Sequence, residues 1–309
     1  MTQIKTIRIA TRKSKLALWQ AHYVKSAIEK QHPDIHISFV EMTTEGDQNQ
    51  QVALTHIGGK SLFVKSLQNA LLHHDADIAV HSIKDMSVQE TKGLTLAAIC
   101  ERADPRDAFL SNDYADLLSL PQNAVVGTAS PRRESLMKSL RPDISITLLR
   151  GNVDTRLAKL QNKEYDAIVL AAAGLHRLQL THHIQSYFAE DFFTPAIGQG
   201  AIGIECREAD QALQTLLQSL NHADTARCVT AERAVNKILG GDCHTPIGAH
   251  ATIHDDVMQL NAMIASLDGK QIYRAHAAAA LSDANEIALG TRVAQDLLAQ
   301  GAKDLLDHA

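Results

Sequence analysis

The stretch Ala124–Gly174, AVVGTASPRRESLMKSLRPDISITLLRGNVDTRLAKLQNKEYDAIVLAAAG, decides the fold class of this chain. Its apolar runs predict strands over 124–130, 144–152 and 165–174, and the segment 153–164 predicts a helix between the last two. Ser130 followed by Pro131 has the form of a helix N-cap and a first helical residue, so a helix is also expected after the first strand. Strands that alternate with helices are typical of an α/β domain with a mainly parallel sheet.

The same alternation precedes this stretch and stops after it. Strands are expected over 4–10, 36–42, 77–82 and 94–100, and helices over 15–30 and 61–74. Residues 191–207 predict a crossing segment and then a strand, and 225–239 a helix. A hairpin around Asp268-Gly269 follows, with a last helix from near Asp283 to Gly301. We therefore expect an α/β domain 1 of residues 1–100 plus 198–220, an α/β domain 2 of residues 101–197, and a smaller α+β domain 3 of residues 221–309.

Composition excludes several classes of function. A net charge of −5 argues against general nucleic-acid binding. No run of 18 apolar residues occurs, so no membrane partner is expected. The opening residues, MTQIKTIRIATRKS, lack the apolar core of a signal peptide, which favours a cytoplasmic protein. Nothing in the sequence indicates an oligomer, so a monomer is the default expectation.

One of the four cysteines stands apart from the others. Cys100, Cys206 and Cys228 lie among apolar or helical residues, so we expect them to be buried. Cys243 lies in the loop LGGDCHTPIG, between a glycine pair and a proline. It could be a nucleophile, a zinc ligand, half of a disulfide, an attachment point or an incidental residue. Adjacent residues such as Cys243 and His244 rarely bind one tetrahedral metal together, so no metal site is expected.

Polar residues collect where the predicted strands end. Ligands of open parallel sheets bind at the carboxyl ends of the strands, and arginine binds carboxylate or phosphate bidentately. An anionic small molecule is therefore the indicated ligand, although a solvated surface is the better interpretation of any single arginine. The residues concerned are Arg12, Ser14, Lys84, Asp85, Thr128, Ser130, Arg132, Arg133, Arg150, Arg156 and Arg177. Two facing domains would line a cleft with these side chains.

The only acid in this set, Asp85, has two interpretations. It could pair with an arginine or cap a turn, or it could act as a proton donor and acceptor in a cationic cleft. The nearby segment Gly198–Gly203, GQGAIG, matches the dinucleotide pattern G-x-G-x-x-G. That pattern must follow a strand and open a helix, whereas here it follows a proline-containing turn and leads into a predicted strand, so we reject it.

Six motifs in order resemble the porphobilinogen deaminase, or hydroxymethylbilane synthase, family. They are HSIKD (81–85), ERADPRDAF (101–109), GTASPRRE (127–134), LRGNVDTRL (149–157), PAIGQGA (195–201) and GGDCHTPIG (240–248). The resemblance covers roughly residues 7–250. It implies two periplasmic-binding-protein-like α/β domains and a third domain that carries the cysteine.

The resemblance also implies an activity and a set of roles. The activity is a transferase of porphyrin and heme biosynthesis, which adds four porphobilinogen molecules head to tail, releases ammonia, and frees a linear tetrapyrrole by hydrolysis. Asp85 matches the family's catalytic aspartate. Cys243 would carry a dipyrromethane cofactor through a thioether, with cofactor-binding contacts from Lys84, Thr128, Ser130, Arg132, Arg133, Arg150 and Arg156. The expected substrate-binding residues are Arg12, Ser14, Gln20, Arg177 and Gln199.

Two other functions compete with this interpretation. A non-enzymatic, two-lobed binder of a dicarboxylate would satisfy the fold and the arginines, but it gives no role to Cys243 or Asp85. A nicotinamide oxidoreductase depends on GQGAIG alone and fails on the context of that motif. Colour with Ehrlich's reagent separates these functions, because only a pyrrole-bearing protein develops it.

Overall fold

The structure is a computed structural model that describes residues 4–42, 61–241, 245–283 and 285–307. The chain forms two compact units. Unit 1 consists of Met1–Ala103 and Ala201–Ala226, and unit 2 of Asp104–Gly200 and Arg227–Ala309.

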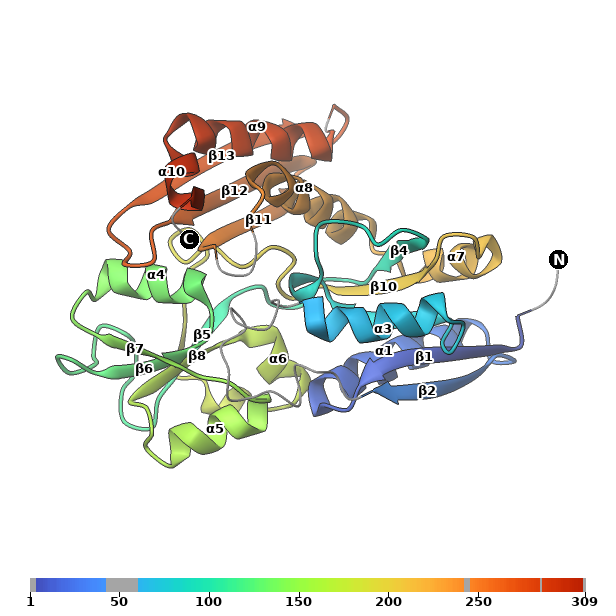
Figure 1. The fold of residues 1–309 in the computed structure, drawn as a ribbon, viewed down its shortest axis with the longest axis horizontal. Coiled ribbons are helices and arrows are strands. Elements are labelled where there is room, and N and C mark those ends of the chain that lie inside the picture. The colour runs from blue at the N-terminus through green and yellow to red at the C-terminus, as the bar shows by residue number, and fades with distance from the viewer. Residues whose placement is uncertain (1–3, 43–60, 242–244, 284, 308–309) are drawn as a thin grey trace. The chain divides into compact units, whose positions relative to one another are not determined.

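The described part of unit 1 is built on a five-stranded sheet with the order β2-β1-β3-β10-β4 (Figure 1). Its strands are β1 (Thr6–Arg12), β2 (His36–Met42), β3 (Ile78–Ser82), β4 (Leu94–Ile99) and β10 (Ile202–Arg207). Its helices are α1 (Lys15–Gln31), α3 (Ser61–Leu72), α7 (Gln211–Leu217) and the short 3-10 helices η2 (Ile83–Asp85) and η4 (Gln218–Leu220). Side chains alternate across a strand, so Ile9 packs in the core that contains α1 and α7, while Ala10 packs with α3. Both faces of the sheet are therefore covered.

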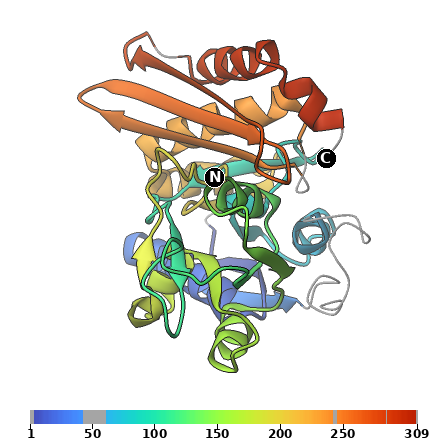
Figure 2. The ribbon, with the colours of Figure 1, turned by 90° about the vertical axis from the view of Figure 1, so that its left-hand side faces the viewer.

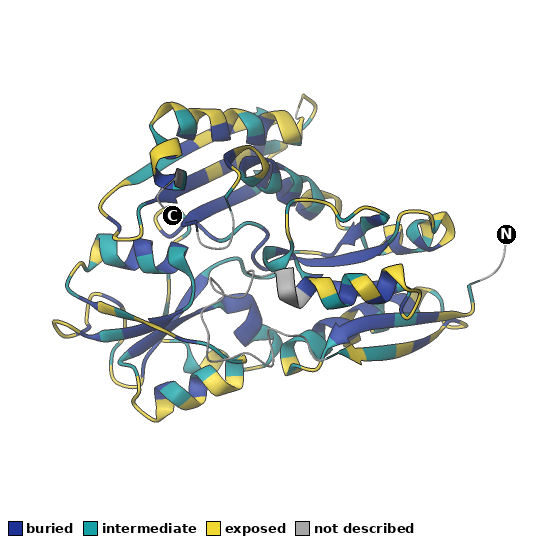
Figure 3. Cartoon of the chain, in the orientation of Figure 1, coloured by how far each residue is buried: buried dark blue, intermediate teal, exposed yellow. Residues whose placement is uncertain are grey.

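The second sheet belongs to unit 2 and has the order β7-β6-β8-β5-β9. Its strands are β5 (Asp107–Leu110), β6 (Val125–Thr128), β7 (Ser145–Leu148), β8 (Ala167–Ala171) and β9 (Ser186–Tyr187). Its helices are α4 (Pro131–Leu140), α5 (Val153–Gln161), α6 (Ala172–Arg177) and the 3-10 helix η3 (Thr181–His183). Leu136 of α4 packs in one core cluster, and Leu157 of α5 and Leu175 of α6 pack in another. The central strands are buried on both sides (Figure 3).

The third sheet is an antiparallel meander with a helical layer on one face (Figure 2). It contains β11 (Ile247–His254), β12 (Val257–Ala265) and β13 (Ile272–Ala280), and its helices are α8 (Ala223–Leu239), α9 (Glu286–Ala299) and α10 (Ala302–Asp307). The two long helices cross closely at Gly290, where a Cβ atom would lie 2.3 Å from the carbonyl oxygen of Ala231. Only glycine permits that approach.

The tip of the β12–β13 hairpin joins this sheet to α4. Gly269 has a φ of +70°, and a Cβ atom there would lie 2.4 Å from the carbonyl oxygen of Ser135 and 2.7 Å from the amide nitrogen of Ser139. Met263 and Ala265 of β12 share a core cluster with Leu136. The second and third sheets therefore belong to one packed unit.

The expected fold class is confirmed, with two α/β sheet domains and a small three-stranded C-terminal one. Both α/β sheets are mainly parallel, as expected, but each contains one reversed strand that was not predicted to be antiparallel. β10 runs antiparallel to β3 and β4, and β5 runs antiparallel to β8 and β9. Ile202 pairs with Ser82 and Asp107 with Ala171, so each returning chain enters its sheet at the carboxyl edge of the parallel strands. Apolar patterning has no direction, so it could not reveal this reversal.

Several element ends were predicted well and others were not. Ser130 caps α4 with Pro131 at the first helical position, as expected. The last helix begins later than predicted, because the side chain of Asn285, not Asp283, accepts the amide of Ala288. The strand expected over 165–174 ends at Ala171, where three alanines lead into α6, because alanine is the strongest helix former. Strands β5 and β9 and helix α7 were not predicted.

The hairpin tip gives the first testable prediction. Gly269→Ala should lower the free energy of unfolding by about 1–3 kcal/mol more than Gly240→Ala, because the new methyl group meets the backbone of α4. Gly240 is a matched control, since its φ is +71° but no heavy atom of the described residues lies within 4 Å of the added Cβ. Urea denaturation measures both variants. Equal losses would mean that the tip does not support α4.

Candidate active site

In unit 1 the candidate residues lie at the carboxyl edge of the sheet. Strand β3 ends at Ser82, and the chain turns through η2, which contains Lys84 and Asp85. The amide of Ile83 donates to the carbonyl of Ala201 at 3.1 Å, and the amide of Met86 donates to the carbonyl of Ile83 at 3.0 Å. Ile83 is buried, whereas Lys84 and Asp85 are half-buried. The turn is therefore anchored by its first residue and presents the next two.

The other predicted residues of unit 1 surround the same edge. Strand β1 is parallel to β3, so Arg12 at its end belongs to this edge. Ser14 caps α1 by accepting the amide of Ala17 at 3.3 Å. Gln20 is only 3% exposed and donates its amide to the hydroxyl of Ser82 at 2.8 Å. The described contact of Gln20 thus fixes the end of β3, and its binding of substrate stays a prediction.

In unit 2 the strands β6, β7 and β8 end at one edge of the second sheet. Thr128 pairs with Leu148 in the parallel register of β6 and β7. The hydroxyl of Thr128 accepts the amide of Ser130 at 3.1 Å, and Ser130 caps α4. A hydroxyl and a helix N-terminus thus lie at this edge, which is an arrangement suited to an anion.

Two of the predicted arginines meet in the interior at one carboxylate. Arg132 Nη2 lies 2.7 Å from Asp107 Oδ2, and Arg133 Nη2 lies 2.7 Å from Asp107 Oδ1. Gln199 Nε2 donates to Asp107 Oδ1 at 3.1 Å and to the carbonyl of Pro105 at 2.6 Å. Asp107 and Gln199 are fully buried, and both arginines are less than one-tenth exposed. We call Asp107, Arg132, Arg133 and Gln199 the Asp107 cluster.

The Asp107 cluster also ties separate segments of unit 2 together. Arg132 Nη1 donates to the carbonyl of Thr194 at 2.7 Å, and Arg133 Nη1 donates to the carbonyl of Val169 at 2.9 Å. Burial lowers the pKa of Arg132, while the charge of Asp107 opposes that shift. The nitrogen Nε of Arg132 has no hydrogen-bond partner among the described residues. The cluster connects α4, β5, β8 and the crossing segment that leads towards β10.

The remaining predicted arginines of unit 2 are half-buried and differ in setting. Arg150 follows β7, and Arg156 donates from Nε to the carbonyl of Gly151 at 2.7 Å. Gly151 has a φ of +114°, so the turn between them suits glycine. Arg177, at the end of α6, donates to the carbonyl of Gly200 at 2.7 Å. Arg150 and Arg156 thus flank one turn at the carboxyl edge.

The attachment residue expected from the sequence, Cys243, lies outside the described residues. The segments on either side of it are closely packed. A Cβ atom on Gly241 would lie 2.2 Å from Cδ1 of Ile247, and one on Gly248 would lie 2.8 Å from the carbonyl oxygen of Thr194 and 3.2 Å from Cδ of Arg132. The chain therefore leaves the cysteine loop directly beside the Asp107 cluster.

The other three cysteines are buried, as expected. Burial raises the pKa of the Cys206 thiol to about 11, so this thiol is not a nucleophile at neutral pH.

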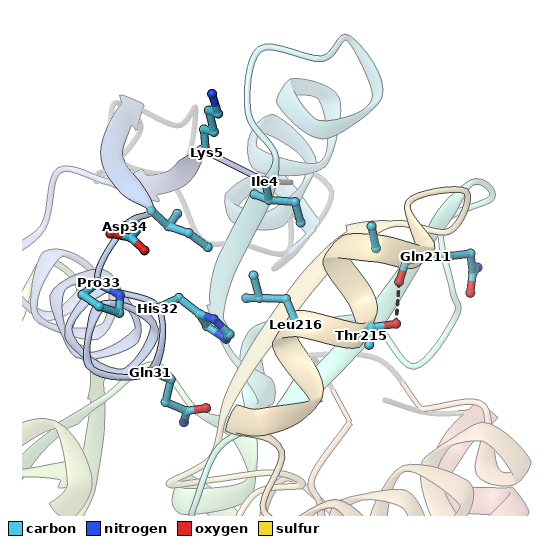
Figure 4. Close-up of a pocket in the computed structure, with 11 residues that line it drawn as sticks. Ile4, Lys5, Gln31, His32, Pro33, Asp34, Gln211, Thr215 and Leu216 are labelled. Carbon is cyan, nitrogen blue, oxygen red and sulfur yellow. Dashed lines mark hydrogen bonds between the residues drawn. The ribbon is translucent and has the colours of Figure 1, made fainter. Parts of the chain in front are cut away.

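A hollow of about 850 Å³ lies away from these residues (Figure 4). It is lined by Ile4 and Lys5 just before β1, by His32 and Asp34 before β2, and by Leu216 of α7. These positions are at the amino ends of β1 and β2, whereas Arg12 is at the opposite end of β1. The hollow is therefore not part of the candidate site.

The described residues contain neither a metal-binding group nor a membrane-spanning helix. No group of histidine, cysteine or acidic side chains in them has the arrangement of a metal site. None of their helices combines the length and the apolar character that crossing a bilayer requires.

Sequence reasoning missed the acid on which this site is built. Asp107 lies within the motif ERADPRDAF, yet no role was expected for it. The available signal was the adjacent pair Arg132 and Arg133 in a helix that also buries apolar residues, since a buried arginine requires a carboxylate partner. The sequence does not say which carboxylate that is.

The cluster gives the second prediction. Asp107→Asn should lower the free energy of unfolding by about 3–5 kcal/mol, because two buried guanidinium groups lose their counter-charge. Asp143→Asn is the control, since Asp143 pairs with Arg141 at 2.7 Å but both side chains are partly exposed to solvent, so its loss should be clearly smaller. Urea denaturation compares the two. A small loss in Asp107→Asn would show that the cluster is not a structural anchor.

Solved structures similar to this chain include binding proteins of bacteria. A YaeC-family lipoprotein of Enterococcus faecalis is 15% identical over 75% of this chain and 96% of its own, with a TM-score of 0.46. The aliphatic sulphonate binding protein SsuA of Escherichia coli is 15% identical over 76% of this chain and 70% of its own, with a TM-score of 0.42. At such scores and identities the likeness carries no information on ligand or activity.

Family models match almost the whole chain. Residues 7–215 match the porphobilinogen deaminase, dipyrromethane cofactor binding domain, and residues 226–299 match the porphobilinogen deaminase, C-terminal domain. The two matches include Asp85, the Asp107 cluster, both flanking arginines of Gly151 and the cysteine loop. The chain belongs to the porphobilinogen deaminase family.

Proposed function

We propose that this protein condenses four molecules of porphobilinogen head to tail into hydroxymethylbilane, with loss of one ammonia at each addition. The observation that carries the proposal is the position of Asp85. This carboxylate follows the central strand β3 at the carboxyl edge of unit 1, in a chain whose family match spans residues 7–215 and 226–299. A carboxylate at such an edge is suited to proton transfer on a bound ligand.

The residues of unit 2 fit the cofactor of this family. A dipyrromethane bears acetate and propionate groups, so its site must supply cations and hydrogen-bond donors. The hydroxyl of Ser130, the N-terminus of α4, and half-buried Arg150 and Arg156 belong to one sheet edge. Gly248 lets the chain leave the cysteine loop beside Arg132. This donor set matches a carboxylate-rich group tethered at residue 243.

We therefore assign two sets of residues. Cys243 attaches the dipyrromethane, which when bound supplies the pyrrole carbon that accepts the first substrate unit. The dipyrromethane carboxylates are bound, or the dipyrromethane site is shaped, by Lys84, Thr128, Ser130, Arg132, Arg133, Arg150 and Arg156. The substrate is bound by Arg12, Ser14, Gln20, Arg177 and Gln199. Within these sets Arg132, Arg133 and Gln199 act through the Asp107 cluster, because their described hydrogen bonds are internal.

Asp85 serves two proton transfers in each addition. In the first, its protonated form donates to the aminomethyl nitrogen of porphobilinogen, so that the carbon–nitrogen bond breaks and ammonia leaves. The free α-carbon of the terminal pyrrole then attacks the methylene carbon that ammonia has left, and the carboxylate accepts the proton that this α-carbon loses. The first transfer consumes a proton and the second returns one, so a single carboxylate suffices. It also stabilises the positive charge that develops between the two transfers.

The role of Asp85 is tested by Asp85→Asn. Turnover of porphobilinogen should fall by about 10²–10⁴-fold, while the unfolding midpoint and the mass of the loaded protein stay unchanged. Asp34→Asn, an exposed acid before β2 in the same unit, is the control and should keep full activity. Wild-type turnover in Asp85→Asn would remove Asp85 from the chemistry. A passive binder would show no turnover in any variant.

The role of Arg150 is tested by the length of the enzyme-bound chain. Arg150→Leu should block or shorten the series of mass increments that appears on incubation with porphobilinogen, because a carboxylate loses its bidentate partner. Arg292→Leu, an exposed position of α9, is the control and should give the wild-type series. A wild-type series in Arg150→Leu would make Arg150 a surface residue without a role in assembly.

A further inference from the structure

A chain of polar side chains lies on the face of the unit 1 sheet that α3 covers. His81 Nε2 is 3.1 Å from Glu205 Oε2, and Gln68 Nε2 donates to Glu205 Oε1 at 2.9 Å. The hydroxyl of Thr91 donates to Gln68 Oε1 at 3.1 Å. His81 is 5% exposed and Glu205 is 3% exposed. We call these four residues the His81 network.

The His81 network lies among buried apolar residues of the sheet. Glu205 lies in the strand IGIECR, whose other members from Ile202 to Cys206 are apolar and buried. Burying a carboxylate is costly unless partners satisfy it, and well-packed apolar residues often stabilise a core equally well. A purely structural requirement therefore does not explain why these two polar residues stand here.

The position of the network relative to Asp85 suggests what it does. In the β3–β10 register His81 pairs with Gly203 and Ser82 pairs with Ile202, directly before the turn that contains Lys84 and Asp85. A Cβ atom on Gly203 would lie 2.4 Å from Cδ1 of Ile83, so Ile83 packs flat on β10. Thr91 belongs to the segment that follows the turn. The network thus joins the strand before the turn to the segment after it, through β10 and α3.

We propose that His81 and Glu205 are positioning residues that fix the turn carrying Asp85 at the geometry needed for proton transfer. The inference rests on the proposed function of Asp85. Proton transfer requires the carboxylate within hydrogen-bond reach of its target, and a displacement of about 1 Å can cost about 10²-fold in rate. The His81 network is hydrogen-bonded to the segments before and after the turn, so it restricts displacement of Asp85.

The same pair of strands offers a matched control. Asp77, just before β3, accepts hydrogen bonds from Arg8 and Arg207 at the opposite end of the strand. It is a partly buried carboxylate with more hydrogen bonds than Glu205, but it is remote from the turn. If the buried polar contacts of this sheet serve stability alone, a variant at Asp77 and a variant of the His81 network should change stability and kcat in the same way.

The experiment compares His81→Leu/Glu205→Leu with Asp77→Asn. The double variant replaces both partners, so it leaves no orphaned charge in the core. We expect its unfolding midpoint to be no lower than that of Asp77→Asn, its kcat to fall about 10–100-fold, and its KM to change less than about threefold. The amides of Ile83 and Met86 should exchange with solvent at least about tenfold faster. Asp77→Asn should lose stability and keep wild-type kcat and exchange at both amides.

Three results would overturn the proposal. They are wild-type exchange at Ile83 and Met86 in the double variant, faster exchange with wild-type kcat, or an equal loss of kcat in Asp77→Asn. Glu205→Gln, which retains the bond from Gln68, guards against a double variant that does not fold, and it should shift exchange and kcat in the same direction by a smaller factor. A failure of the proposed function would appear separately as wild-type turnover in Asp85→Asn, because amide exchange does not depend on the reaction.

Discussion

The architecture of unit 2 depends on one buried carboxylate. Asp107 lies between the guanidinium groups of Arg132 and Arg133, and without it two positive charges would be left in the interior. The same side chains reach the backbone of Thr194 and Val169, so the cluster sets where the N-terminus of α4 and the crossing segment lie. The chain leaving the cysteine loop packs against this assembly at Gly248. A structural charge cluster therefore shapes the surroundings of the proposed attachment point.

In unit 1 the turn at the carboxyl edge is held in place by groups other than a buried ion pair of this kind. The carboxylate proposed to react, Asp85, is half-buried, and its turn is held by neighbouring residues. Ile83 packs on β10, Gln20 donates to Ser82, and Glu205 lies at hydrogen-bond distance from His81. In both units the chain enters the sheet at the carboxyl edge of the parallel strands, through β10 in one and β5 in the other. The antiparallel strands thus supply the buried carboxylates, Asp107 at the carboxyl edge and Glu205 three residues after the start of β10.

Much of the fold could be predicted from local pattern, and the anchors could not. The cap at Ser130 and the hairpin at Asp268-Gly269 are encoded by adjacent residues, so the sequence revealed them. The direction of β10 in the sheet depends on where the chain returns from unit 2. The apolar pattern of a strand is the same for a parallel and an antiparallel strand, so it does not predict this direction. Asp107 and Arg132 are 25 residues apart in the sequence. Only the tertiary fold therefore selects Asp107 as the partner of Arg132 and Arg133. The family motifs named the candidate residues, but only the structure separated Arg132 and Arg133, bound internally, from half-buried Arg150 and Arg156.

The central claim is that this chain is primed by a covalent pyrrole cofactor and extends it. The most direct measurement is the intact mass of the purified protein, before and after incubation with porphobilinogen. The account predicts an excess equal to two deaminated porphobilinogen units, absent in Cys243→Ala, and further increments of one unit on incubation. A protein of unmodified mass that gains nothing with porphobilinogen, or a Cys243→Ala protein that carries the same excess, would contradict it.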